Sequence, residues 1–153
     1  MLINSEVLGE IEIETKDIIH FAKGIPAFEE YQQYVIIPLE ERSPFYYLQS
    51  VQKTDLCLVI AQPFVFFPDY EIEIADDELQ SLEVNGEAAD LAIYVILTIP
   101  DDFRLTTANL LAPIVVNPEN HQAMQYVTVG NKYSSRHLIF RSESMAAAAK
   151  EGD

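Results

Sequence analysis

The sequence predicts an all-β protein: a small antiparallel or mixed β-barrel or pseudobarrel of about ten short strands with one or two short helices. Three observations support this fold class. Hydrophobic residues make up 49% of the 153-residue chain, enough to build one core. The eight prolines stand at the edges of apolar runs, where a missing N–H does not interrupt a sheet. Between the prolines lie short segments with strand-like patterns.

The first part of the chain is expected to form three strands and one short helix. Gly9–Glu14 reads GEIEIE, so its isoleucines face one side and its glutamates the other, as in a half-buried strand. Ala27–Gln33 (AFEEYQQ) places Phe28 and Tyr31 three residues apart, which predicts a short helix. The other two strands are expected at Ile3–Val7 and Asp17–Phe21.

The middle of the chain carries the next strands. Leu56–Ala61 (LCLVIA) is apolar on both faces, which predicts a central position or a place where a curved sheet closes on itself. Asp69–Ile74 (DYEIEI) alternates apolar and acidic residues and predicts a second half-buried strand with an acidic outer face. Two further strands are expected, at Val35–Ile37 and Tyr46–Gln49.

A second helix and the remaining strands follow. Asp76–Leu82 (DDELQSL) begins with acids that suit a helix N-terminus, with Asp76 or Asp77 as the N-cap. Leu91–Ile99 (LAIYVILTI) is apolar on both faces and predicts another central strand. The last strands are expected at Arg104–Ala108, Ile114–Val116, Tyr126–Val129 and His137–Phe140.

The chain is expected to form one domain with a C-terminal tail. Residues 1–141 hold all the predicted strands and should form a single β-barrel-like domain. Ser142–Asp153 (SESMAAAAKEGD) has helix propensity from its alanines but little apolar surface to pack. We expect this tail to be frayed or disordered.

Charge is the strongest compositional feature. The net charge of −16 disfavours direct binding to nucleic acid or to an acidic lipid surface and favours a basic protein partner. Residues 1–102 hold 21 acidic against 4 basic residues, whereas residues 103–141 hold one acid against four basic residues. This asymmetry predicts two different surfaces, although acidity that only maintains solubility is the alternative.

The cellular compartment is expected to be the cytoplasm, without a membrane anchor. The N-terminal residues lack the basic start and apolar stretch of a signal peptide. The apolar run at Leu91–Leu97 is too short to cross a bilayer. Because Cys57 is the only cysteine, the chain can form neither an internal disulfide nor a cysteine-based zinc site, and we expect Cys57 in the core.

Catalytic, metal and cofactor sites are not expected. The sequence lacks a Gly-x-Ser-x-Gly elbow, a Gly-rich phosphate loop and the alternating acids of a calcium loop. His20 and His137 fit structural positions in or beside strands, and His121 fits an exposed turn. The consecutive acids at 76–78 and 101–102 fit helix-capping and turn roles. A carboxylate pair of the glycosidase type has no positive support.

The aromatic segment Gln62–Tyr70 (QPFVFFPDY) has two interpretations. Four adjacent apolar residues between two prolines could form a core strand that crosses the barrel. Alternatively, they could form an exposed aromatic rim that receives an apolar helix or strand from a partner. Such a rim beside the acidic 69–78 stretch would suit an amphipathic, basic ligand.

Five segments resemble the FliW family in the same order along the chain. Phe21–Glu29 reads FAKGIPAFE and is similar to the family pattern F-x-x-G-(I/L)-P-G-F-E. The resemblance spans about residues 1–140, and the other four segments are Pro44–Ser50, Pro63–Tyr70, Asn109–Asn117 and Gln125 with the strand after it. Ala27 and Ala123 stand where the family usually has glycine. Alanine would be strained there if those glycines adopt positive φ.

The resemblance implies a non-enzymatic bacterial protein with two partners. One is flagellin, held unpolymerised before export. The other is CsrA, a small dimeric RNA-binding protein that represses translation of the flagellin message. Flagellin export would free the protein to bind CsrA and relieve the repression, which couples two binding equilibria reciprocally.

Candidate contact residues follow from charge and from the similar segments. The acidic, aromatic stretch is assigned to CsrA, through Phe64, Phe66, Phe67, Asp69, Glu71, Glu73, Asp76 and Asp77. The less acidic part is assigned to flagellin, through Asn109, Leu110, Pro113 and Gln125. Tyr46, Tyr47 and Gln49 fit core and turn roles instead.

Two rival functions remain open at this point. The first is an OB-like module that binds nucleic acid or carbohydrate, for which the only basic set is Arg104, Lys132, Arg136 and Arg141. The second is a hydrolase or carbohydrate-active enzyme on a β-scaffold, which would need a pocket with converging polar groups.

Overall fold

Seven strands close into a barrel, which confirms the predicted fold class. The computed structural model describes residues 1–84, 91–128, 130 and 132–140, so the predicted tail at 142–153 lies outside the described residues. Helical turns are α1 (Asp76–Ser81) and the 3-10 turns η1 (Thr15–Asp17), η2 (Pro63–Val65) and η4 (Phe103–Leu105). The strands are β1 (Leu2–Ser5), β2 (Gly9–Glu12), β3 (Ile19–Phe21), β4 (Gln33–Pro38), β5 (Phe45–Ser50), β6 (Cys57–Ala61), β7 (Ala92–Thr98), β8 (Thr107–Ala108), β9 (Ile114–Asn117), β10 (Gln122–Gln125) and β11 (His137–Leu138).

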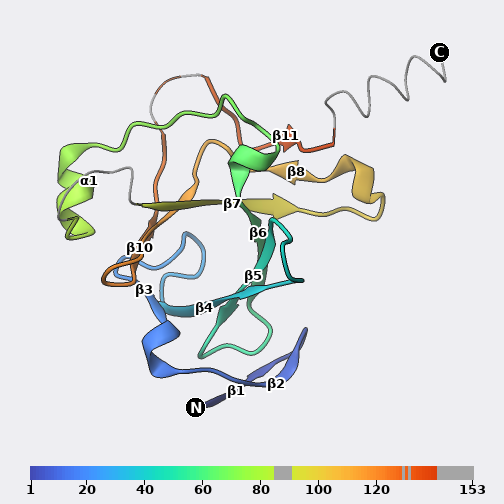
Figure 1. The fold of residues 1–153 in the computed structure, drawn as a ribbon, viewed down its shortest axis with the longest axis vertical. Helices are drawn as coiled ribbons and strands as arrows, with labels where there is room; N and C mark the ends of the chain where they lie inside the picture. Colours follow the sequence, from blue (N-terminus) through green and yellow to red (C-terminus); the bar gives the residue numbers. More distant parts are fainter. Residues whose placement is uncertain (85–90, 129, 131, 141–153) are drawn as a thin grey trace.

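The barrel runs in the order β3–β4–β5–β6–β7–β9–β10 and closes where β10 pairs with β3 (Figure 1). That closing pair is parallel, and the other barrel pairs are antiparallel. One edge of β7 bonds to β6. Along the other edge, the first residues of β7 bond to β9 and its last residues bond to β8. β8 in turn pairs with β11. This confirms the central position predicted for Leu91–Ile99.

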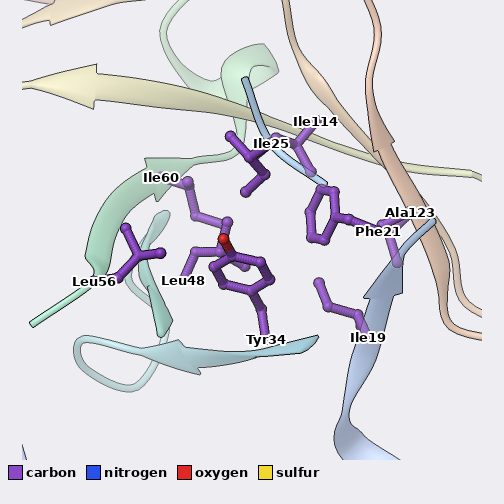
Figure 2. Close-up of a cluster of buried hydrophobic side chains, with 10 residues drawn as sticks. Ile19, Phe21, Ile25, Tyr34, Leu48, Leu56, Ile60, Ile114 and Ala123 are labelled. Atoms are coloured by element: carbon purple, nitrogen blue, oxygen red, sulfur yellow. The ribbon is translucent and has the colours of Figure 1, made fainter. Parts of the chain in front are cut away.

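The barrel interior is filled by side chains from most of its strands. Figure 2 shows Phe21 and Tyr34 at the middle of this cluster, and their rings meet edge to face with centroids 5.2 Å apart. Buried aliphatic residues surround them, among them Ile19, Ile25, Leu48, Leu56, Ile60, Ile114 and Val116. A second cluster fills the space between the outer face of β6 and β7, β8, β11 and the segment after η2.

One polar group is unpaired inside the barrel core. The Tyr34 hydroxyl points into the cluster of apolar side chains (Figure 2) and has no hydrogen-bond partner in the described part of the chain. Burial raises the pKa of Tyr34 to about 12, so the hydroxyl stays protonated at neutral pH. An unpaired buried hydroxyl lowers stability because it has lost its bonds to water.

Replacing Tyr34 with phenylalanine should therefore raise the free energy of unfolding by about 1 kcal/mol. The matched control is Tyr70→Phe, because the buried Tyr70 hydroxyl donates to the Leu110 carbonyl oxygen at 2.7 Å. That control should lower the free energy of unfolding by about 1 kcal/mol, since it leaves the carbonyl unpaired. Urea denaturation measures both values, and a loss of stability in Tyr34→Phe would contradict the unpaired state of its hydroxyl.

The β1–β2 hairpin docks on the barrel through a buried polar network. Gln49 is fully buried, and its Oε1 accepts a hydrogen bond from the Ser5 hydroxyl at 2.7 Å. Its Nε2 donates to the carbonyl oxygen of Ser50 at 3.0 Å. Apolar contacts complete the hairpin interface, through Ile3, Ile13, Ile18 and Val35. Gln49 therefore has the structural role predicted for it.

Two predicted elements are absent from the described residues. Ala27–Gln33 forms successive turns and not a helix up to the start of β4, because Ala27 has φ of +76°, which a right-handed helix does not allow. Asp69–Ile74 does not pair as a strand, because tyrosine hydroxyls bond its backbone in place of a neighbouring strand. Its alternation of exposed acids and inward apolar residues is nevertheless as predicted.

Other elements differ at their boundaries. The helix predicted at Asp76–Leu82 is α1, but its N-cap is Ala75 and neither aspartate caps it. The strand predicted at Arg104–Ala108 is reduced to β8, because the Asp102 carboxylate accepts from the Arg104 backbone N–H and starts η4. The strand predicted at Tyr126–Val129 is wrong for residues 126–128, which form no strand; the strand in this region is β10, which ends before them at Gln125. Residues 126 and 128 still bond the chain before β9, and residue 129 lies outside the described residues.

Candidate functional site

A group of exposed carboxylates forms the most distinctive surface, and we refer to it as the acidic face. It comprises Asp69, Glu71, Glu73, Asp76 and Asp77, all predicted contact residues and all exposed. None of the five makes an ion pair with any residue that the structure describes. The acidic face therefore presents uncompensated negative charge to solvent.

Three tyrosines hold the segment that carries the acidic face. The Tyr133 hydroxyl accepts a hydrogen bond from the Glu71 backbone N–H at 2.9 Å. The Tyr126 hydroxyl donates to the Glu73 carbonyl oxygen, also at 2.9 Å. Tyr70 anchors the start of the segment through its bond to Leu110, and burial raises the pKa of Tyr70, which keeps its hydroxyl a donor. No local pattern reveals these roles of Tyr126 and Tyr133, because their hydrogen bonds join residues distant in the sequence.

The aromatic residues beside the acidic face have different roles. Neither interpretation of the 62–70 segment fits completely, because it forms η2 and turns, not a strand. Phe64 is 47% exposed and forms the predicted apolar rim together with exposed Val65. Phe66 and Phe67 are half-buried: Phe66 packs on Phe45 and Phe67 on the ring of His137. Their predicted place on the rim is therefore corrected to a place at the edge of the second core cluster.

An apolar groove runs along the segment between Phe64 and α1. Its volume is about 450 Å³. Two glutamates of the acidic face stand at its border, and apolar side chains form most of its wall. The lining residues are Phe64, Tyr70, Glu71, Ile72, Glu73, Ile74, Leu91 and Ile93.

Helix α1 is fixed to the barrel at its C-terminal end. The Asn117 Nδ2 donates to the Leu82 carbonyl oxygen at 3.0 Å, and Asn120 donates to the same oxygen. The Leu82 side chain is buried against Val115. At the other end, Lys23 approaches Glu78 at 3.9 Å. These contacts fix the position of α1, which carries Asp76 and Asp77 and follows the 69–74 segment directly in the chain (Figure 1).

The residues predicted to contact flagellin lie in and beside the loop before β9. The Asn109 Oδ1 accepts from the Ala112 N–H at 3.1 Å, and the Gln125 Nε2 donates to the Ala112 carbonyl oxygen at 3.0 Å. Asn109 and Gln125 are half-buried. Leu110 and Pro113 are buried, so their side chains can shape the loop but are not available for direct contact with a partner.

The Phe21–Glu29 segment is a tight turn with a structural function. Gly24 has φ of +68°, and a Cβ there would lie 2.4 Å from the Glu29 Cα. The Glu29 carboxylate accepts from the Ala27 N–H at 2.7 Å. Ala27 itself has φ of +76°, which confirms strained backbone at this departure from the pattern. Ala123, in contrast, lies within β10 without positive φ, so the condition for strain is not met there.

Two of the histidines and the cysteine occupy local structural positions. The His137 Nε2 accepts a hydrogen bond from the Ser134 backbone N–H. His121 is half-buried, not exposed as predicted, and has φ of +60° in the turn between β9 and β10. Cys57, expected in the core, is half-buried at the first position of β6, and burial raises the pKa of its thiol.

Two further observations concern metals and membranes. Among the described residues, His, Cys, Asp and Glu side chains nowhere gather in a group of three that could hold a metal ion. In the same part of the chain, the helices fall short of the length and apolar character that a bilayer crossing requires.

A second apolar hollow has no signature in the sequence. It measures about 400 Å³ and lies between the β4–β5 loop and the loops around η4. Ile99 and Phe103 on its wall are more than half exposed. The charge asymmetry gave no signal for it, since its lining carries no charged side chain; the lining residues are Leu39, Phe45, Tyr47, Val59, Leu97, Ile99, Phe103, Thr106, Ile139 and Phe140.

Comparison with known proteins gives a consistent result. The sequence profile of the family described as "FliW protein" matches residues 2–139. A flagellar assembly factor FliW from Syntrophomonas wolfei is 47% identical over 157 residues, covering 99% of this chain and all of the relative. A protein of the same description from Geobacillus kaustophilus is 46% identical over 140 residues, covering 92% of this chain and 96% of the relative.

A solved structure gives the same match at the level of the fold. The crystal structure of a flagellar assembly factor FliW aligns with a TM-score of 0.85 and 44% sequence identity. The alignment covers 92% of this chain and 97% of that chain. The barrel, the tight turn and the segment that carries the acidic face all lie within the residues that the family profile matches.

Proposed function

The chain belongs to the FliW family of flagellar assembly factors, and from this premise we propose that it couples flagellin export to flagellin translation by binding flagellin and CsrA. It acts in the cytoplasm without catalysis. Binding to flagellin holds the subunit before export. Binding to CsrA removes CsrA from the flagellin message and relieves translational repression.

The acidic face is the observation that carries this proposal. CsrA binds RNA, and an RNA-binding surface needs basic residues that neutralise phosphates. Five exposed carboxylates without an ion pair among the described residues suit such a partner. Opposite charge raises the rate of encounter and selects the partner. The exposed Phe64 ring beside the carboxylates adds the apolar contact that a stable complex requires.

The OB-like alternative is weaker on the same grounds. Arg104 is paired with Asp102 at 3.0 Å, so its charge is compensated. Lys132 lies over the Tyr133 ring and shares a hollow with Glu71 and Glu73. Single-stranded nucleic acid requires a basic track with stacking aromatics, but Arg104 is paired and a strand that approached Lys132 would be repelled by the nearby carboxylates.

Isothermal titration against CsrA and flagellin, singly and together, tests the proposed function. The protein should bind each partner alone, and saturating flagellin should lower its affinity for CsrA. By linkage, CsrA should lower the affinity for flagellin by the same factor. Absence of binding to either partner would refute the proposal.

We place the flagellin contact at the loop before β9, through the accessible parts of Asn109 and Gln125. Asn109→Ala and Gln125→Ala should each weaken flagellin binding and leave CsrA binding unchanged. Each change removes one hydrogen bond to Ala112 and should lower the free energy of unfolding by about 1 kcal/mol, too little to unfold the protein. Fluorescence anisotropy with labelled flagellin measures the effect, and unchanged flagellin affinity in both variants would exclude this placement.

A further inference from the structure

The backbone of residues 71–74 has one bonded side and one open side. The bonded side consists of the Glu71 N–H and the Glu73 carbonyl, which the hydroxyls of Tyr133 and Tyr126 engage. Along an extended chain, the N–H and C=O groups of alternate residues point to the same side. The N–H and C=O groups of Ile72 and Ile74 must therefore point to the opposite side. These four groups have no hydrogen-bond partner within the described part of the chain.

The open side coincides with the apolar groove. The hollow on the bonded side contains Tyr133, Lys132 and Thr128. The groove lies on the other side of the same segment, where its wall includes Phe64, Leu91 and Ile93. An extended segment with unpaired backbone groups next to an apolar groove is the arrangement to which a peptide can add as a strand.

We propose that this edge receives an extended basic segment of a partner protein as an added strand, a binding mode that rests on the proposed function of the acidic face. The main chain of the partner bonds to Ile72 and Ile74. Its alternate side chains lie opposite Glu71 and Glu73 on the outer face, where lysine or arginine forms cross-strand pairs of opposite charge. The intervening side chains are apolar and enter the groove.

Several features match this ligand and exclude an acidic one. Lys132 lies on the bonded side, so it does not neutralise the open edge. Asp69 and Asp76 extend the negative charge beyond both ends of the segment, where both are exposed. A nucleic-acid strand lacks the backbone amides that Ile72 and Ile74 require and carries charge of the wrong sign.

A capped seven-residue peptide of alternating lysine and valine tests the binding mode by NMR with the full-length protein. We expect the amides of Ile72 and Ile74 to gain protection from hydrogen exchange when the peptide binds. In an antiparallel pair the valines opposite Ile72 and Ile74 make the main-chain bonds, so N-methylation of the valine amides should abolish binding. In a parallel pair the flanking lysines make these bonds, so N-methylation of the lysine amides should abolish binding. Equal binding of the two methylated peptides, or no protection at Ile72 and Ile74, overturns strand addition.

A matched pair of double variants measures how much the glutamate charges contribute to peptide affinity. Glu71→Lys with Glu73→Lys should weaken the peptide about tenfold, since two favourable pairs become repulsive. Glu40→Lys with Glu41→Lys changes net charge equally at exposed positions outside the groove, and it should leave peptide affinity nearly unchanged. Equal loss in the two variants overturns the specific pairing.

Titration with CsrA separates this inference from the proposed function. If CsrA binds while Ile72 and Ile74 stay unprotected in its complex, strand addition is wrong and the proposed function stands. If the peptide binds as expected and CsrA does not bind, the open edge is a peptide site and the proposed function is wrong.

Discussion

Replacing Gly24 with alanine should lower the free energy of unfolding by about 3 kcal/mol. Two effects act together at this position. The backbone has φ of +68°, where an L side chain is strained. The added Cβ would also lie 2.4 Å from the Glu29 Cα and 2.6 Å from the Glu29 carbonyl oxygen, so backbone would have to move. Because Ile25 beside this turn is buried in the barrel core, the displacement should spread into the core.

Gly9 provides a matched control for the steric effect. Its φ is +76°, and a Cβ there would meet nothing within 4 Å. Gly9→Ala should therefore lower the free energy of unfolding by only about 1 kcal/mol, the effect of the backbone conformation alone. Urea denaturation measures both variants. Equal losses would mean that the clash with Glu29 does not limit this turn.

Replacing Asn117 with alanine should lower the free energy of unfolding by about 2 kcal/mol. Asn117 is buried, and its amide joins the end of α1 to the β9–β10 hairpin. Its Oδ1 also accepts a hydrogen bond from the Glu119 N–H. Removing the side chain leaves buried backbone groups with fewer partners and loosens α1, which carries two carboxylates of the acidic face.

Asn120→Ala is the control for this effect. Asn120 bonds the same Leu82 carbonyl oxygen from a half-buried position, so its loss should lower the free energy of unfolding by about 1 kcal/mol. Thermal unfolding compares the two variants, and amide exchange in residues 76–81 reports the loosening of α1. A larger loss in Asn120→Ala than in Asn117→Ala would contradict the role of Asn117 as the main anchor.

The fold class and the face patterns were predictable from sequence because they depend on local periodicity. Leu91–Ile99 is apolar on both faces, and as β7 it bonds to three strands. In Asp69–Ile74 the alternation correctly separated Tyr70 and the isoleucines, which face inward, from the exposed acids. The exposure of these acids was therefore predictable from the sequence.

The remaining differences arise from contacts between distant parts of the chain. Asp69–Ile74 reads as a strand, but the tyrosine hydroxyls at 126 and 133 bond its backbone, and no local pattern reveals this. Phe66 and Phe67 could not be separated from Phe64, because their burial depends on Phe45 and His137. The helix expected at Ala27–Gln33 fails because a positive φ at Ala27 is a property of the tight turn as a whole.

The segments that resemble the family mainly maintain the fold. Gly24 and Glu29 form the tight turn, Gln49 docks the N-terminal hairpin, and Asn109 and Gln125 fix the loop before β9. The acidic face owes its position to this scaffold, yet most of its carboxylates lie outside those segments. The similar segments therefore belong mainly to the barrel scaffold, whereas the proposal for the partner rests on the exposed charge.

The charge-reversed variant Glu71→Lys with Glu73→Lys measures the central claim, that the acidic face binds CsrA. Isothermal titration at low and high salt should show CsrA affinity about tenfold weaker than in the unmodified protein, with a flatter salt dependence, because screening acts on attraction between opposite charges. Glu40→Lys with Glu41→Lys should keep both the affinity and the salt dependence. CsrA affinity that is unchanged by reversal at 71 and 73 would contradict the account.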